Sequence, residues 1–438
     1  MAAPVSPVVD ARPSAPAPVP QPITVSRFAA GQALNVRRHL DALRDFRRDE
    51  FGDSIARPTA GHIHAVNSLL GQLRTPLDRA VHVLEQAAGS PSTDAMASRA
   101  ETLLTAKSRA HDWVRATEKV WDFYFELFGQ RQSAFGVWLV SCDRIALDCY
   151  QHVFMHLGQP RSIPSPPPFA YMRTGFSPAT YRRGIPLRKL GRQSNPFPLV
   201  QLPYHRLVNP WTMGAILHEV SHNLQNELDL QSEVPAAIVH RLGSAGAPRE
   251  AQLIWARWNR EIFGDMLGLL LGGEAFVASL LDVIGRAPEQ VLDYSPRGVH
   301  PTPYLRAKLS FHLLSSMGFD DVAQHYAAVW HRLYPNTSTH TMPAQLFDTA
   351  ERAIPLVVEA VVGTKFVGLG RKSLREVIFF EPRHQVMIEE AAQRLASGID
   401  PGVIPERFLI GAVRVAVDRG LAEPETLMRN FYLELSRR

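Results

Sequence analysis

The stretch Leu217-His218-Glu219-Val220-Ser221-His222-Asn223 decides how the rest of this chain is interpreted. Side chains four residues apart lie on one face of an α-helix, so His218 and His222 can bind one metal ion together. Glu219 then lies beside the open coordination position of that ion. This spacing is the local signature of a zinc hydrolase, in which the metal takes three protein ligands and leaves a fourth position for water.

The residues upstream predict the helix that this pattern needs. Asn209 and Pro210 supply an N-cap residue followed by proline at the first helical position, and apolar residues follow at helical spacing. The pattern is therefore expected two to three turns into a mostly apolar helix. The simpler alternative for either histidine is a core residue whose polar atoms are satisfied by hydrogen bonds.

A second helix, expected from Arg249 to Leu271, offers the third ligand. Glu261 is the candidate, and Asp265 follows one turn later on the same face. The Asp265 carboxylate can accept a hydrogen bond from the non-coordinating nitrogen of a ligand histidine, which fixes the tautomer of that ring. The alternative is a solvated helix face, but the apolar run from Met266 to Leu271 favours a buried helix.

Together these motifs resemble those of the gluzincin zinc metallopeptidases. His300-Pro301 with Arg306 sharpens the likeness, because a His-Pro pair followed by an arginine is similar to the HtpX and CaaX-prenyl-protease branch. The resemblance covers residues 199–306, about a quarter of the chain. Gly264 stands where that branch usually has alanine.

The resemblance implies a fold, a cofactor and a set of functional residues. The fold is α+β and mostly α, with a zincin-like metallopeptidase core, a small edge sheet and added helical regions. The implied cofactor is zinc, held by His218, His222 and Glu261, with Asp265 supporting a ligand, Glu219 as the general base, and His300 and Arg306 serving the transition state or the architecture of the site.

The expected reaction is hydrolysis of a peptide bond in a protein or peptide. Zinc brings the pKa of a bound water toward about 7, and Glu219 is a carboxylate placed to receive its proton. The negative oxygen that forms on the attacked carbonyl needs a donor besides the metal. His300 is the first candidate for that donor, and Tyr294, Tyr304 and Arg306 follow.

Charge along the chain suggests a substrate preference. The whole chain of 438 residues carries a net charge of only +5, so electrostatic arguments must be local. Between Cys149 and His218 there is no Asp or Glu, but there are eight basic residues: Arg161, Arg173, Arg182, Arg183, Arg188, Lys189, Arg192 and Arg206. A cleft of one charge sign concentrates opposite charges, which favours an acidic peptide region as substrate.

The same basic stretch leaves two other interpretations open. Nucleic acid is a competing partner, since Tyr171, Phe176 and Tyr181 lie among the arginines and could stack on bases. A solvated loop that balances acidic surface elsewhere is the simpler one. For the chain as a whole, the competing function classes are therefore a zinc-stabilised scaffold without activity and a nucleic-acid binder working through residues 161–206.

A short β-prone run, residues 196–204, precedes the pattern helix and is bracketed by prolines. Because proline is confined to sheet edges, the run predicts an edge strand that could hold the backbone of an extended peptide. The alternative is a strand that only completes a small sheet.

Composition indicates four regions in an ordinary globular chain, 45% hydrophobic and 20% charged. They are a disordered Pro/Ala-rich tail (1–24), an N-terminal helical region (25–157), the metallopeptidase core (158–335) and a C-terminal helical region (336–438). Further helices are expected from Asp320 to Leu333, Ala344 to Val361 and Gln385 to Leu395. Arginine far outnumbers lysine, which with many Ala and Pro suggests a GC-rich bacterial genome.

Location is predicted from cysteines and apolar runs. Cys142 and Cys149 lie too far apart in one expected helix for a disulfide, so both are expected to be reduced, as in the cytoplasm. The tail lacks a secretion signal. Residues 263–285 form the longest apolar run, but three acidic residues interrupt it, so no membrane span is expected. Its Gly264, Gly268 and Gly272 predict close approach by another helix.

Overall fold

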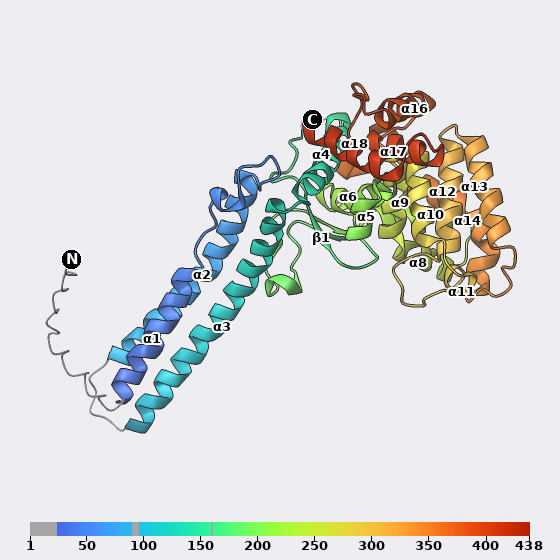
Figure 1. Cartoon of the computed structure of the whole chain (residues 1–438). Coiled ribbons are helices and arrows are strands. Elements are labelled where there is room, and N and C mark those ends of the chain that lie inside the picture. The colour runs from blue at the N-terminus through green and yellow to red at the C-terminus, as the bar shows by residue number, and fades with distance from the viewer. Residues whose placement is uncertain (1–23, 90–95, 159–160) are drawn as a thin grey trace, which may run out of the picture. The chain divides into compact units, whose positions relative to one another are not determined.

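The computed structural model describes residues 24–89, 96–158 and 161–438 (Figure 1). Of the predicted tail, all but Thr24 lies outside the described residues. The described chain is mostly helical and contains one three-stranded sheet, which confirms the predicted α+β, mostly α class.

The helices are as follows in chain order. The first four are α1 (Val25–Ala42), α2 (Ala60–Gly89), α3 (Met96–Gly129) and α4 (Gly136–His156). The next eight are α5 (Tyr204–Val208), α6 (Gly214–Glu227), α7 (Glu233–Ser244), α8 (Arg249–Arg257), α9 (Asn259–Gly272), α10 (Glu274–Ile284), α11 (Pro288–Val291) and α12 (Pro303–Ser316). The last six are α13 (Asp320–Leu333), α14 (Ala344–Val362), α15 (Leu374–Val377), α16 (Pro382–Ala396), α17 (Phe408–Asp418) and α18 (Pro424–Arg437).

Short 3-10 helices connect several of these elements. They are η1 (Arg48–Phe51), η2 (Gln130–Gln132), η3 (Arg188–Leu190), η4 (Pro210–Thr212) and η5 (Val367–Leu369).

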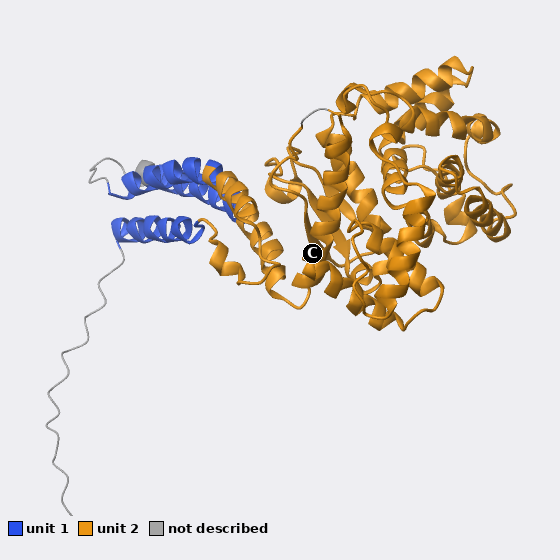
Figure 2. Cartoon of the chain, turned by 90° about the horizontal axis from the view of Figure 1, so that it is seen from above, with its two compact units in different colours: residues 1–44, 72–118 blue, residues 45–71, 119–438 orange. Residues whose placement is uncertain are grey.

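The chain divides into two compact units, coloured separately in Figure 2. Unit 1 comprises residues 1–44 and 72–118, and unit 2 comprises residues 45–71 and 119–438. Within unit 1, α1 is joined to α2 by Arg37, whose Nε lies 2.8 Å from Glu85 Oε1. Lys107 on α3 donates to Gln32 on α1 at 2.6 Å. Four apolar residues of α1 are buried at helical spacing, namely Ala29, Ala33, Val36 and Leu40.

This division differs from the predicted boundary at residue 158, because α4 packs against α6, α18 and β1 within unit 2. A buried ion pair marks the connection. The Arg131 guanidinium lies 2.8 Å from Asp143 Oδ2 and also donates to the carbonyl of Ala170 at 2.6 Å. Leaving this buried cation without its partners would be costly, so the last part of the predicted N-terminal region is tied to the sheet.

The sheet consists of β1 (Phe169–Arg173), β2 (Ala179–Tyr181) and β3 (Leu199–Pro203), in the order β1-β3-β2. β3 pairs in parallel with β1 and antiparallel with β2. The prediction of an edge strand in residues 196–204 is therefore wrong, since β3 is the central strand. Pro198 precedes the strand and Pro203 ends it, so neither proline interrupts the pairing between them. The edge near the predicted site belongs to β2.

Two predicted helices differ in their boundaries. The helix carrying the His-Glu pattern begins at Gly214, because residues 210–212 form η4 and Asn209 donates its amide to the carbonyl of His205 at 2.6 Å, without capping the helix. The pattern therefore lies only one to two turns into α6. The predicted helix from Arg249 to Leu271 is divided into α8 and α9 at Trp258.

The core of unit 2 is built around α6 and α9, which pack side by side. A Cβ at Gly272 would lie 2.4 Å from Leu217 of α6, and one at Gly268 would lie 2.3 Å from Phe276 of α10. The predicted close approach of another helix to these glycines is thus confirmed. Among the described helices, none combines the length and the apolar character needed to cross a membrane.

Candidate metal centre

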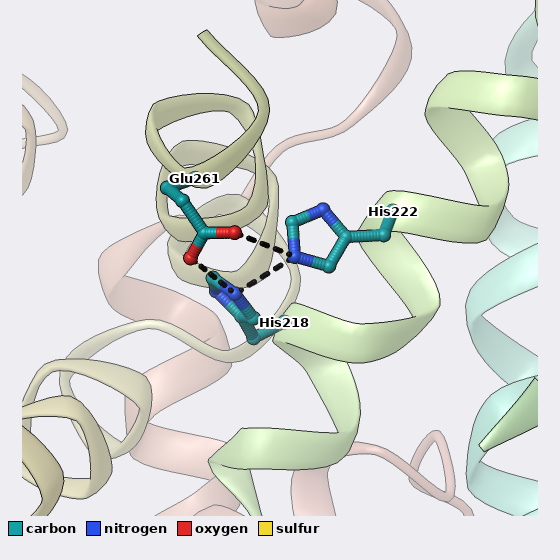
Figure 3. A group of neighbouring side chains, drawn as sticks. All are labelled: His218, His222 and Glu261. Carbon is teal, nitrogen blue, oxygen red and sulfur yellow. Dashed lines mark hydrogen bonds and ion pairs between the residues drawn. The ribbon is translucent and has the colours of Figure 1, made fainter. Parts of the chain in front are cut away.

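The helices α6 and α9 bring the three predicted ligands together (Figure 3). His218 Nε2 lies 3.0 Å from His222 Nε2, and Glu261 presents one carboxylate oxygen to each ring, at 3.4 Å and 3.5 Å. The candidate donor atoms all lie within 4.8 Å of one another. Two imidazoles and one carboxylate match the ligand set of catalytic zinc, so the residues present fit that metal.

Gly264 allows the two helices to approach at this point. A Cβ at residue 264 would lie 2.8 Å from His218 Cε1 and 3.1 Å from His222 Cε1. The first distance is shorter than carbon atoms tolerate and the second is tight, so a side chain here would displace the His218 ring and crowd the His222 ring. The departure from alanine noted in the sequence therefore has a steric reason in this chain.

Asp265 contacts the His218 ring on its Nδ1 side, away from the Nε2 atom that faces His222 and Glu261. Its Oδ1 lies 3.0 Å from His218 Nδ1, and the Arg306 guanidinium donates to both of its oxygens at 2.8 Å and 2.7 Å. Burial alone would raise the pKa of Asp265, but Arg306 and His218 hold it below its ordinary value. With the proton on Nδ1 facing this carboxylate, His218 would offer to a bound metal its Nε2, the atom that faces Glu261 and His222.

In the metal-free chain, the two imidazoles differ in charge. Burial opposes protonation of both, but Asp265 and Glu261 raise the pKa of His218 to about 10. Burial and the neighbouring His218 cation lower the pKa of His222 to about 3. The carboxylate of Glu261 has a lowered pKa despite its burial, because His218 donates to it. In the metal-free chain, the protonated His218 ring thus provides positive charge beside His222 and Glu261. A bound metal cation would provide positive charge there instead.

Glu219 is buried beside this group, and burial raises the pKa of its carboxyl. The hydroxyl of Thr180 on β2 lies 2.6 Å from Glu219 Oε2 and 2.8 Å from its main-chain oxygen. One carboxylate oxygen is thereby positioned by the strand, while Oε1 has no such partner among the described residues. Thr180 was not predicted as a site residue, and nothing in the linear sequence around it indicates this contact.

The other predicted residues divide into two groups. His300 is 63% exposed in its side chain and has Nε2 3.4 Å from Glu261 Oε2, so it borders the site. Arg306 contacts Asp265 and lies 3.8 Å from Glu261, so it supports the site's architecture. Among the described residues that line the cleft, neither Tyr294 nor Tyr304 occurs. The Tyr294 hydroxyl instead accepts a hydrogen bond from Arg257.

The group opens into a cleft with two halves that share His218, Glu219, Glu261 and His300. The larger half has a volume of about 500 Å³ and includes β2 residues Ala179 and Thr180. The smaller half, about 170 Å³, is lined mainly by α6 and α10. The ligands therefore face a concave space large enough for a peptide segment, and the free edge of the sheet borders that space.

The predicted basic stretch does not form one surface at this cleft. Arg183 is ion-paired with Glu227 at 2.9 Å, and Arg173 is ion-paired with Glu126 at 2.9 Å. Tyr171 is fully buried, so it is not available to stack on a base. Of the eight basic residues, Arg182 lines the cleft.

Comparison with family models, with curated proteins and with solved structures found no match to this chain. The assignment of the site therefore rests on its residues and their geometry.

Proposed function

We propose that this chain is a zinc-dependent metallopeptidase of the gluzincin type, with a zincin-like core formed by the sheet and helices α6 and α9. The observation that carries the proposal is the convergence of His218, His222 and Glu261 within 4.8 Å, at a cleft that Glu219 also lines. Two helices supply this set, as the resemblance implies. The cleft supplies the space for a substrate.

His218, His222 and Glu261 would hold the zinc ion. When bound, zinc would lower the pKa of water and polarise the substrate carbonyl. Asp265 keeps the proton of His218 on Nδ1, so that Nε2 presents its lone pair to the ligand group. Arg306 in turn fixes both oxygens of Asp265. These two residues are positioning residues.

Glu219 acts as the general base. Its Oε2 is held by Thr180, so Oε1 is the atom that takes the proton from the attacking water and returns it to the departing amine. Burial raises the pKa of this carboxyl, which increases its affinity for the proton. His300 borders the same space and is the candidate protein donor to the negative charge that develops on the carbonyl oxygen.

The substrate backbone is an extended peptide that adds to the free edge of β2. Ala179 and Thr180 of this strand line the cleft, whereas both edges of β3 are already paired. This assignment moves the predicted backbone contact from residues 196–204 to residues 179–181.

Metal analysis combined with Glu219→Gln tests the proposal. The purified chain should hold about one zinc, and His218→Ala should lose it, since only two ligands remain. His240→Ala, at an exposed position on α7, is the matched control and should keep the metal. Glu219→Gln should retain zinc and lower peptide cleavage by roughly 10²- to 10⁴-fold.

The same measurements separate the competing classes. Zinc that is lost in His218→Ala while no cleavage is detected in the wild-type chain would identify a scaffold. Binding to nucleic acid that survives Glu219→Gln and falls steeply with salt would identify a nucleic-acid binder. No contact in the described chain favours that last class, given the pairing of Arg173 and Arg183.

A further inference from the structure

The two halves of the cleft differ in charge on either side of the candidate metal ligands. The larger half contains three arginines, Arg182, Arg257 and Arg260, from two segments far apart in sequence. The smaller half is lined by apolar side chains, among them Phe276, Leu280 and Val283. A substrate that crosses the site would therefore meet cations on one side and an apolar wall on the other.

The arginines of the larger half are not neutralised by the protein. Neither Arg182 nor Arg260 forms an ion pair with a carboxylate within residues 24–89, 96–158 and 161–438. Arg257 is held by the Tyr294 hydroxyl at 3.0 Å and the Gly298 carbonyl at 3.1 Å, both uncharged. By contrast, Arg306 in the smaller half is fully engaged by Asp265.

The positive charges of Arg182 and Arg260 also repel each other. Burial and the charge of Arg260 together lower the pKa of Arg182, so the two guanidinium groups are close enough to repel. The acidic residues of this half, Glu219 and Glu261, are already engaged with Thr180 and with the histidines. Two like charges that face one half-buried space, and that are not ion-paired with any carboxylate of the described residues, favour the entry of an anion.

We propose that this half of the cleft is a specificity pocket for the side-chain carboxylate of an aspartate or glutamate adjacent to the scissile bond. Arg182 and Arg260 donate charge-assisted hydrogen bonds to that carboxylate, with Arg257 adding to the local positive charge. The apolar half accepts an apolar side chain on the opposite side of the bond. This assignment rests on the proposed peptidase function and adds the class of substrate to it.

Cleavage profiling of the zinc-loaded full chain tests the pocket. A library of peptides with amidated C-termini is digested, and cleavage sites are mapped by mass spectrometry. The best-cleaved sequence is then synthesised with Glu, Gln or Lys at the position expected to face the arginines. The Glu peptide should have a kcat/KM about tenfold above that of the Gln peptide, the size expected for one half-exposed charged hydrogen bond, and the Lys peptide should be cleaved least.

Charge variants then identify the residues responsible. Arg182→Gln and Arg260→Gln should each bring the ratio of Glu to Gln cleavage close to one, and Arg260→Lys should retain much of it. Arg332→Gln, at an exposed position on α13 outside the cleft, is the matched control and should leave the ratio unchanged. The preference for Glu should also weaken with added salt.

Each of the other possible results of these cleavage experiments would contradict a specific part of the proposal. Equal cleavage of the Glu and Gln peptides would eliminate the acidic pocket while leaving the peptidase function intact. Cleavage that requires a free C-terminus would assign the arginines to a terminal carboxylate, against the proposal. A zinc-loaded chain that cleaves neither the amidated library nor the same peptides with free C-termini would remove the peptidase function and the pocket together.

Discussion

Two places in unit 2 combine an arginine, an aspartate and a histidine, but the order of contact differs. At the candidate metal centre, the histidine contacts the carboxylate, because His218 Nδ1 lies 3.0 Å from Asp265 Oδ1. Between α4 and α17, the histidine touches the guanidinium, because His152 Nδ1 lies 3.2 Å from Arg407 Nη2. Arg407 also contacts both oxygens of Asp148, at 3.0 Å and 2.9 Å.

The difference in order gives the two histidines opposite properties. The carboxylates beside His218 raise its pKa, so without a metal this ring carries a proton on both nitrogens; a bound metal would replace the proton on Nε2, while the proton on Nδ1 would still face Asp265. Burial, followed by the charge of Arg407, lowers the pKa of His152 to about 3, so that ring is neutral and accepts a hydrogen bond. The same three residue types thus flank a candidate metal ligand in one place and link α4 to the start of α17 in the other.

The largest expected effect is on stability and comes from breaking the ion pair between Asp148 and Arg407. Asp148→Ala leaves the buried Arg407 cation uncompensated and should lower the free energy of unfolding by about 3–5 kcal/mol. Urea unfolding measures this change, and zinc content should stay at the wild-type value. The double variant Asp148→Ala/Arg407→Met should recover part of the loss, because it removes both charges. A double variant no more stable than the single one would contradict the explanation by charge.

Substitutions in the Asp265–His218 pair should affect metal binding more than substitutions in the Asp148–Arg407 pair. Asp265→Asn removes the negative charge that lies 3.0 Å from His218 Nδ1 and should lower zinc affinity by about 10- to 100-fold, or about 1.4–2.7 kcal/mol. Competition with a chelator measures this affinity. Asp148→Asn is the matched control and should leave it unchanged. Equal zinc affinity in the two variants would remove the distinction between the pairs.

The smallest expected effect is a pH dependence of the unfolding free energy that comes from His152 beside Arg407. Because the folded-state pKa of His152 is about 3 and its unfolded value is about 6.5, the unfolded chain binds the proton first. Its contribution to stability is complete above pH 6.5 and is lost progressively as the pH decreases toward 3, and the loss is about 2 kcal/mol at pH 5. His152→Gln should flatten the fall in unfolding free energy between pH 7 and pH 5. Identical slopes in both proteins would show that His152 does not titrate in this way.

Sequence patterns predicted the parts of the site that depend on helical spacing. His218 and His222 are four residues apart, as are Glu261 and Asp265, so each pair had to share a helix face once its helix was expected. Helix α13 has the expected bounds for the same reason, since its apolar period is regular. The rules of helical spacing were therefore enough to predict which residues each of the two helices contributes to the ligand group.

Contacts between distant segments could not be predicted in this way. Thr180 reaches Glu219 only because β2 pairs with β3, and strand order is not encoded in the alternation of any one strand. The division at Trp258 and the late start of α6 were missed because helix ends depend on tertiary packing as well as capping residues. Arg260, likewise, looks like an ordinary surface arginine until its neighbours are placed.

The missing side chain of residue 264 has a consequence for how this chain can change through mutation. A Cβ at this position would lie 2.8 Å from His218 Cε1 and 3.1 Å from His222 Cε1, so replacement of the glycine requires the His218 ring to move. Substitutions at position 264 should therefore weaken metal binding unless the His218 ring or α6 shifts to make room. Homologues that carry a larger residue there would be expected to have altered the opposing helix as well, so that the two helices vary together.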